Sequence, residues 1–454
     1  MKKYFTLLIL LFAFMSAINS QVKLDSIEYE KIKNQIRGEI LDEIKSQKLT
    51  AQSESEKKAI DLWSKFSLRG YGVANYYQYN YDTDPNLKNK LDAERLNLYL
   101  EYKFNEKINF KSEIEFEHGG TGATLELDTQ EEFGEYEQEI EKGGSVKIEQ
   151  AHLNFLIHPL FNVRAGRLKV YFGLHQTLDT PTRYFTTNRQ EMESEIIPLG
   201  WYENGLEFYG AISKKLAYRV FFVSGLDASG FSSRSWIKGG YQQKFELVNA
   251  ESVAIATRLD YKIGKHKDSF IGFGTYINNA AANRPKNDLN ADAYVSIFDL
   301  HSSYNEKNLR FNTIFLYGML QNSDLVSLKN ANLSNNLGVK RTPVGKSVLG
   351  ISVELGYDVM PFIHANSTFR LYPFIRYDYY DTMFSTEGYV VKNPRWERQT
   401  FTGGVNWFVL PQLVIKAQYA HRGLGSDNYD LTTLLPTGKK KQDRTFSCGI
   451  GYSF

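Results

Sequence analysis

The sequence contains very little cysteine and proline and has almost no net charge. A single cysteine among 454 residues cannot form an internal disulfide or a Cys-rich metal site. Proline accounts for only 11 residues, and the mean hydropathy of −0.41 is too polar for a bundle of membrane helices. Basic residues number 54 and acidic residues 52, so the chain lacks the basic excess of a nucleic-acid-binding protein.

Sequence motifs of common enzyme classes are also missing. The chain has no Gly-x-Ser-x-Gly elbow and no His-Glu-x-x-His pair, and its eight histidines are scattered. Residues 82–86 resemble the start of a calcium loop but lack its glycine and its later glutamate, which favours an ordinary turn. We therefore predict no catalytic residue, no bound metal and no cofactor, although a hydrolase site assembled across loops stays a distant alternative.

The first twenty residues have the pattern of a secretory signal peptide. Met-Lys-Lys is followed by an apolar stretch from Tyr4 to Met15 and by small residues up to Ser20. This order of basic, apolar and small residues predicts cleavage after Ser20. A membrane anchor is the alternative, but the apolar stretch is short for a span. We expect an exported protein of the bacterial outer membrane.

Residues 21–64 form a second segment, rich in lysine and glutamate. Isoleucine recurs at every fourth position and lines one helical face, at Ile32, Ile36, Ile40 and Ile44. The segment is too short and too polar to form a core alone. It is expected to be a helix that pairs with copies of itself as a coiled coil or lies against the rest of the chain, or else a solvated linker.

From Phe66 onward, apolar and polar residues alternate with the period of a β-strand. Connections between the strands are alternately short and long, the arrangement of a transmembrane barrel whose ends both lie on the short side. The chain ends in an aromatic residue, Phe454, as outer-membrane barrels do. We predict an all-β fold, a sixteen-stranded antiparallel transmembrane β-barrel over residues 65–454. The expected strands are 66–81, 90–104, 107–118, 144–158, 161–172, 200–213, 215–225, 249–263, 268–280, 291–304, 308–320, 346–359, 368–380, 396–409, 412–422 and 442–454.

Strand phase also predicts which charged side chains face the lumen. The candidate pore-lining residues are all basic: Arg95, Lys111, Arg167, Lys169, Arg258, Arg370, Arg376, Arg398 and Lys416. Fewer acidic residues share this face, among them Glu113, Glu115 and Glu117. Such charges select solutes in water-filled pores, or they pair across strands and only fill space. Both interpretations stay open.

The loop at 173–199 is the longest connection and is a candidate constriction loop. It carries both signs of charge, including Arg183, Arg189, Glu193 and Glu195. Long loops in compact proteins usually have a role, so we expect this loop to fold into the barrel, with a solvated surface loop as the alternative. The acidic loop at 119–143 and Lys439–Lys441 are expected to be solvated loop tips, with lipid or lipopolysaccharide contacts as the other possibility.

One stretch resembles a known family. Arg-Ala-Gly-Arg-Leu-Lys-Val-Tyr-Phe-Gly at 164–173 looks like the fifth-strand signature of the phosphate-selective porin O/P family, and the similarity continues to about residue 210. This resemblance implies a trimeric sixteen-stranded channel whose loop after the fifth strand enters the pore, with Arg167 and Lys169 at the constriction. The arginine ladder and lysine cluster of phosphate-specific members cannot be matched here residue by residue, so the resemblance concerns fold rather than substrate.

Together these observations predict an outer-membrane porin, a passive channel for small hydrophilic solutes, forming a homotrimer among outer-membrane lipid and lipopolysaccharide. Whether these solutes are anionic stays open. The alternative from another class is a non-conducting barrel that acts in adhesion or binding through its outer loops.

Overall fold

The computed structural model describes residues 31, 33–39, 63–120, 126–128, 137–139, 144–198, 200–242, 247–331, 342–430, 432–433 and 436–454. The chain divides into two units, 1–64 and 65–454. In the first unit, residues 33–39 are helical, whereas the predicted signal peptide and most of the predicted helical segment lie outside the described residues. None of the described helices combines the length and apolar character needed to cross a membrane.

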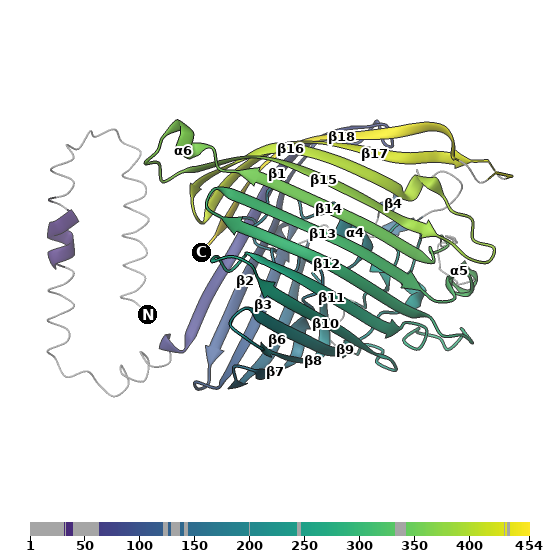
Figure 1. The fold of residues 1–454 in the computed structure, drawn as a ribbon, viewed down its shortest axis with the longest axis horizontal. Coiled ribbons are helices and arrows are strands. Elements are labelled where there is room, and N and C mark those ends of the chain that lie inside the picture. The colour runs from purple at the N-terminus through teal and green to yellow at the C-terminus, as the bar shows by residue number, and fades with distance from the viewer. Residues whose placement is uncertain are drawn as a thin grey trace. The chain divides into compact units, whose positions relative to one another are not determined.

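The second unit is a closed antiparallel barrel of sixteen strands (Figure 1). Each strand pairs with its neighbour in the chain, and the first pairs with the last. The barrel strands are β1 (Phe66–Tyr81), β2 (Lys90–Lys103), β3 (Ile108–Glu117), β6 (Ser145–His158), β7 (Phe161–Lys169), β8 (Tyr202–Ala211), β9 (Leu216–Ser224), β10 (Val253–Lys262), β11 (Phe270–Asn279), β12 (Tyr294–Glu306), β13 (Leu309–Leu320), β14 (Ser347–Tyr357), β15 (Arg370–Ser385), β16 (Glu397–Leu410), β17 (Leu413–Tyr429) and β18 (Pro436–Ser453).

Short elements occupy the connections. A separate two-stranded sheet pairs β4 (Glu126–Asp128) with β5 (Glu137–Glu139) in the connection between β3 and β6. The helices are α4 (Glu191–Ile196), α5 (Ser323–Ala331) and α6 (Met360–Ile363), and the 3₁₀ turns are η1 (His118–Gly120), η2 (Ala228–Gly230), η3 (Lys238–Gly240) and η4 (Pro394–Trp396). Helix α6 and the C-terminus lie toward one end of the barrel and α5 lies toward the other (Figure 1). We call the first end the turn end.

The alternation predicted from the sequence separates the two faces of the barrel wall. On β12, Val295 and Ile297 are fully buried, whereas Phe298 and Leu300 are 41% and 52% exposed. The exposed residues form an apolar outer surface, as a barrel surrounded by lipid requires. Because the sixteen barrel strands pair in a closed ring, the barrel sheet has no open edge among the residues that the structure describes.

Two C-terminal aromatic residues cover the seam where the barrel closes. The backbone N–H groups of Gly70 and Phe454 each donate to the other residue's carbonyl, at 3.0 and 2.9 Å. The ring of Phe454 lies 2.6 Å from the position that a Cβ of Gly70 would take, and the ring of Tyr452 lies 2.4 Å from that of Gly72. Gly70 and Gly72 of β1 therefore leave room for the rings of Phe454 and Tyr452. This packing gives the terminal aromatic residue a structural role.

The sixteen predicted strands agree with the structure to within a few residues, except near the long final loop. The prediction of a loop over 423–441 is wrong for much of that range, because β17 continues to Tyr429 and β18 begins at Pro436. These extensions pair with each other beyond the apolar band, so hydrophobic alternation does not reveal them. Strand β15 likewise runs on to Ser385.

A glycine in β7 offers a sharp test of local geometry. Gly166 has φ +132°, and an added Cβ would lie 2.5 Å from the carbonyl oxygen of Ala151 and 2.9 Å from Cα of His152. Gly166→Ala should therefore lower the free energy of unfolding by about 1–3 kcal/mol. Gly403→Ala is the control, since its Cβ would meet nothing nearer than 4.0 Å. Urea titration of the two folded barrels compares them, and equal stability would contradict the account.

Candidate functional site in the barrel interior

The connection between β7 and β8 lies inside the barrel. We call residues Gly173–Pro198 the inner loop. On one side, Tyr77 of β1 donates to Oδ1 of Asn188 at 2.6 Å, and on the opposite side Asp299 of β12 accepts from the backbone N–H of Gly173 at 3.4 Å. Since the closed strand order places β1 and β12 across the ring from each other, a loop that bonds to both crosses the interior.

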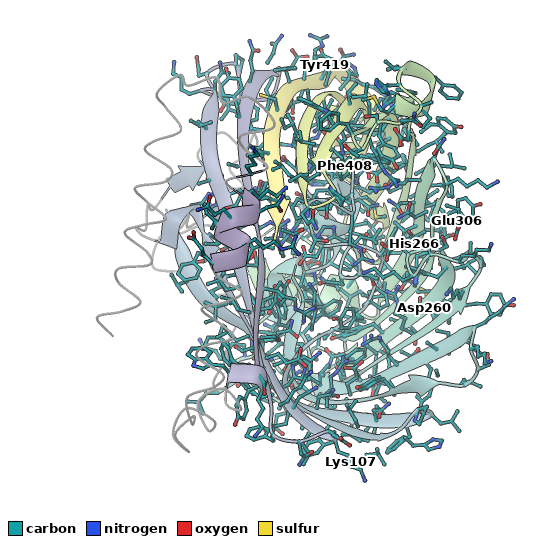
Figure 2. The ribbon with its side chains drawn as sticks, turned by 90° about the vertical axis from the view of Figure 1, so that its left-hand side faces the viewer. Lys107, Asp260, His266, Glu306, Phe408 and Tyr419 are labelled. Carbon is teal, nitrogen blue, oxygen red and sulfur yellow. The ribbon has the colours of Figure 1, made fainter. Side chains whose placement is uncertain are left out.

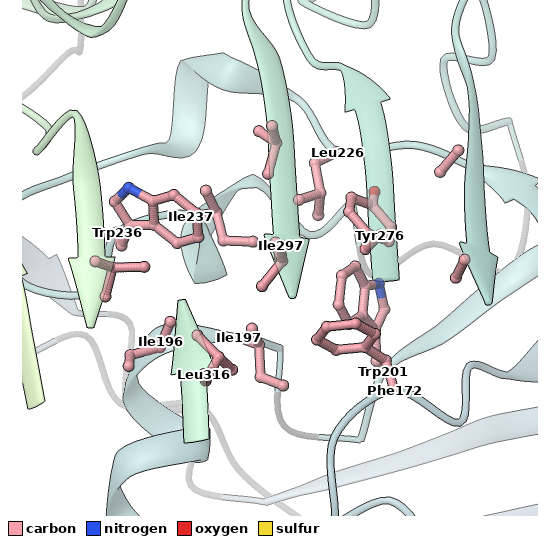
Figure 3. Packing of buried hydrophobic residues seen from close by; sticks show 14 of the residues in the cluster. Phe172, Ile196, Ile197, Trp201, Leu226, Trp236, Ile237, Tyr276, Ile297 and Leu316 are labelled. Carbon is pink, nitrogen blue, oxygen red and sulfur yellow. The ribbon is translucent and has the colours of Figure 1, made fainter. Parts of the chain in front are cut away.

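One side of the inner loop is apolar and packs against β10–β14. Met192 and Ile196 of α4 lie against Gly350 of β14, where a Cβ would come within 2.4 Å of the Met192 sulfur. Figure 3 shows Ile196 and Ile197 grouped with other buried side chains of this cluster, drawn from the loops and from the inward faces of β11–β13: Phe172, Trp201, Leu226, Trp236, Ile237, Tyr276, Ile297 and Leu316. This part of the interior is a packed hydrophobic core.

The connection between β9 and β10 contributes to the same core. Trp236 is fully buried, and its indole N–H donates to the carbonyl of Gly345 at 3.1 Å. Its ring occupies the space in which a Cβ of Gly318 on β13 would lie, 2.2 Å away. A second loop besides the inner loop therefore folds inward, which the sequence analysis did not predict.

The other side of the inner loop is polar and is anchored at Asp179. Lys169 of β7 and Arg95 of β2 reach this carboxylate at 2.8 and 3.1 Å. Burial opposes ionisation of Asp179, but the two cations outweigh it and hold its pKa well below the ordinary value. Arg189, within the loop, contacts the same carboxylate at 3.2 Å and Glu115 of β3 at 3.5 Å.

Glu193 fixes the start of the inner loop. Its carboxylate accepts from the backbone N–H groups of Leu174 and His175, at 2.9 and 3.1 Å. Burial raises the pKa of Glu193 to about 7, although these N–H donors act in the opposite direction. Arg258 of β10 donates to the carbonyl of Gly173. These bonds give Glu193 and Arg258 a structural part in holding the loop.

Lys416 and Arg376 hold the middle of the loop from the opposite wall. Lys416 Nζ lies 2.8 Å from the carbonyl oxygens of Tyr184 and Thr186. Arg376 donates to the Thr186 hydroxyl at 2.9 Å and pairs with Asp378 at 2.7 Å. Both side chains therefore bind loop atoms or a neighbouring carboxylate.

The remaining predicted residues lie at several depths. Arg167 donates to the Glu149 carbonyl at 3.0 Å, and Arg398 donates to the Tyr380 hydroxyl at 3.1 Å. Nearer the turn end, Lys111 lies 3.6 Å from Glu101, Arg370 donates to the Tyr372 hydroxyl at 3.3 Å, and Arg183 pairs with Asp268. Glu195 is half-buried at the end of α4.

The sequence analysis missed several buried interior carboxylates, which are Glu149, Glu203, Glu207, Asp299 and Asp443. Some pair directly, as Glu207 does with Arg164 and Arg219 at 2.8 and 2.6 Å. Interior charge is thus more nearly balanced than strand phase predicted. The register between β3 and β6 shifts between Glu113 and Ile114, so the alternation of β6 is interrupted at Glu149. Simple alternation therefore did not predict that Glu149 faces the interior.

Two adjoining cavities open at the turn end, with volumes of 860 and 600 Å³, and we call them together the turn-end vestibule. His266 and Glu306 line the smaller one and lie close together in Figure 2. The basic lining residues of the two cavities are Arg69, Lys111, Arg164, Lys169, Arg183, Lys265, Lys267, Lys307, Arg310 and Arg370. The acidic ones are Asp179, Asp268 and Glu306. Ten basic side chains and three carboxylates thus line the vestibule, and the inner loop forms part of the lining. Outside this lining, Glu101 pairs with Arg69 and Lys111, and Glu207 pairs with Arg164.

Among the described residues, no three or more His, Cys, Asp or Glu side chains are grouped so that they could hold a metal ion.

The fold is that of the outer-membrane β-barrels. Salmonella typhi OmpF, solved with daunomycin, and the outer-membrane channel DcaP of Acinetobacter baumannii each superpose with a TM-score of 0.50 at 13% identity, covering 86% of this chain and 97% of theirs. An uncharacterized protein of Aquifex aeolicus (strain VF5) is 28% identical over 357 residues, which are 78% of this chain and 74% of that protein. No family model matches the chain.

Proposed function

We propose that this protein is an outer-membrane porin through which small hydrophilic solutes diffuse passively, with a preference for anions. The inner loop is the constriction, and the turn-end vestibule is the wide part of the pore. No covalent step is involved, and no cofactor is needed. Its place in the bacterial outer membrane, among lipid and lipopolysaccharide, and its assembly as a homotrimer belong to the same proposal, as does the export signal at residues 1–20.

The basic excess of the turn-end vestibule is the observation that carries the anion preference. A cavity with low-dielectric walls and charge of one sign raises the local concentration of counter-ions. Among the described residues, Arg310 and Arg370 of the vestibule lining form no direct ion pair with a carboxylate. Arg310, for example, bonds to the carbonyl of Thr182 at 3.1 Å and stacks on Tyr372 and Phe408 at 4.7 and 4.9 Å. Phosphate belongs among the anions to be tested because of the resemblance at 164–210.

The packed hydrophobic core favours a second candidate function. Side chains of the inner loop and of the 225–242 connection fill the interior beside β10–β14. A barrel closed in this way conducts nothing and acts through its outer loops in adhesion or binding. The two candidates differ in whether a solute crosses the barrel.

Solute efflux from proteoliposomes tests the proposal. Gluconate, glucose and glucosamine have similar size and differ in charge, so we expect all three to leave and gluconate to leave fastest. Liposomes without protein give the background. Equal rates of efflux for the three solutes would contradict the proposed anion preference. Efflux at the background rate would favour the non-conducting barrel.

A further inference from the structure

The buried carboxylate of Asp179 lies among several cationic and polar side chains. Its side chain is more than nine-tenths buried, and both of its oxygens are in contact with cations. Five side chains lie around it, with these distances to a carboxylate oxygen: Lys169 (2.8 Å), Arg95 (3.1 Å), Tyr71 (3.2 Å), Arg189 (3.2 Å) and His175 (3.5 Å). Three of the five carry a permanent positive charge, and one of these, Arg189, also contacts a second carboxylate, Glu115, at 3.5 Å.

The barrel wall supplies most of this site, and the inner loop supplies the carboxylate. Tyr71, Arg95 and Lys169 come from β1, β2 and β7 of the closed barrel. Arg95 is further fixed by the Tyr184 hydroxyl, 3.1 Å away. Two buried cations and a hydroxyl aimed at one point form a complete anion-binding site. Leaving such cations without a counter-charge is costly in a low-dielectric interior.

Solutes can reach this site from the turn-end vestibule. Tyr71, Lys169 and Asp179 all line its 860 Å³ cavity, and Thr177 and Thr180 of the inner loop line it beside them. The site therefore lies where the turn-end vestibule meets the inner loop.

We propose that Asp179 is a tethered carboxylate that occupies an anion-binding site of the barrel wall, and that a small free carboxylate such as acetate takes this site when Asp179 is removed. The consequence for transport rests on the proposed function. An anion that enters the vestibule competes with Asp179 for Arg95 and Lys169, so Asp179 limits the anion preference of the intact protein.

Chemical rescue tests the site without requiring conduction. Asp179→Ala in the purified full-length barrel should lower the midpoint temperature of unfolding, and sodium acetate should raise it again in proportion to the logarithm of acetate concentration. Acetamide at equal concentration and ionic strength should not, because it has the same shape without the charge. Wild type should respond to neither. If Asp179→Ala does not fold, the yield of refolded Asp179→Asn with acetate and with acetamide gives the same comparison.

Asp381→Ala is the matched control. Asp381 is also buried and pairs with Lys392 at 2.6 Å, which is its single cation among the described residues. Acetate should not restore the stability that Asp381→Ala loses. Absence of acetate-specific rescue in the Asp179 variants, or equal rescue in Asp381→Ala, would overturn the tethered-carboxylate proposal.

Conductance separates this proposal from the proposed function. Asp179→Asn should make the open channel lean further toward anions. Rescue by acetate in a barrel that conducts nothing would establish the anion site and contradict the porin. A barrel that conducts but shows no rescue by acetate would support the porin and contradict the anion site.

Discussion

Replacing Arg310 and Arg370 by glutamate should greatly weaken the channel's preference for anions. The double change converts two positive charges of the vestibule lining into two negative ones. A unit charge about 7 Å from an ion changes the ion's energy by roughly 0.6 kcal/mol in water. After screening by about 0.1 M salt, the ratio of anion to cation permeability should fall at least about tenfold. The measurement is the reversal potential across a planar bilayer.

Lys214→Glu with Lys215→Glu is the matched control for this charge reversal. Both lysines are exposed in the turn between β8 and β9, at the same end of the barrel, and neither is among the residues that line the vestibule. The same change of net charge there should leave the reversal potential nearly unaltered. An equal effect of the two double variants would show that overall charge matters and the vestibule does not.

The second large effect concerns the hydrophobic core inside the barrel. Trp236→Ala should lower the free energy of unfolding by about 3–5 kcal/mol, because it removes a fully buried indole and leaves a cavity beside Gly318. The lost hydrogen bond to the Gly345 carbonyl adds to the cost. Denaturant unfolding of the folded barrel, followed by tryptophan fluorescence and by heat-dependent mobility on gels, measures the change.

Trp407→Ala gives the comparison. Trp407 lies on the outer face of β16 and is 41% exposed, so its loss leaves no interior cavity. We expect a clearly smaller change in stability. If both variants lost the same amount, the inward-folded 225–242 connection would not be the stabilising element that the structure indicates.

The barrel strands could be predicted because lipid imposes a strict pattern on them. Residues such as Phe298 and Leu300 must face outward at every second position, and a slip by one residue would move them into the interior. The same logic predicted an inward direction for Arg95, Lys169 and Lys416, and each of them contacts a residue of the inner loop. It failed at the ends of β17 and β18, where the strands leave the apolar band and the pattern stops.

The interior arrangement could not be predicted for a physical reason. Loop residues such as Asp179 and Trp236 obey no period, and their partners lie far away in sequence, since Asp179 meets Tyr71 across 108 positions. Glycines of the wall give a local hint, because Gly318 leaves room for Trp236, Gly350 for Met192 and Gly356 for Phe185. Glycines on the inner phase of β13 and β14 were therefore the signal that sequence reasoning overlooked.

The proposal that this barrel is an anion-preferring porin is tested most directly by planar-bilayer recording of the mature protein in a salt gradient. The account predicts discrete conductance steps and a reversal potential on the anion side. Steps with a cation-side reversal potential would contradict the role given to the vestibule, and a folded barrel that produces no steps would contradict the porin itself.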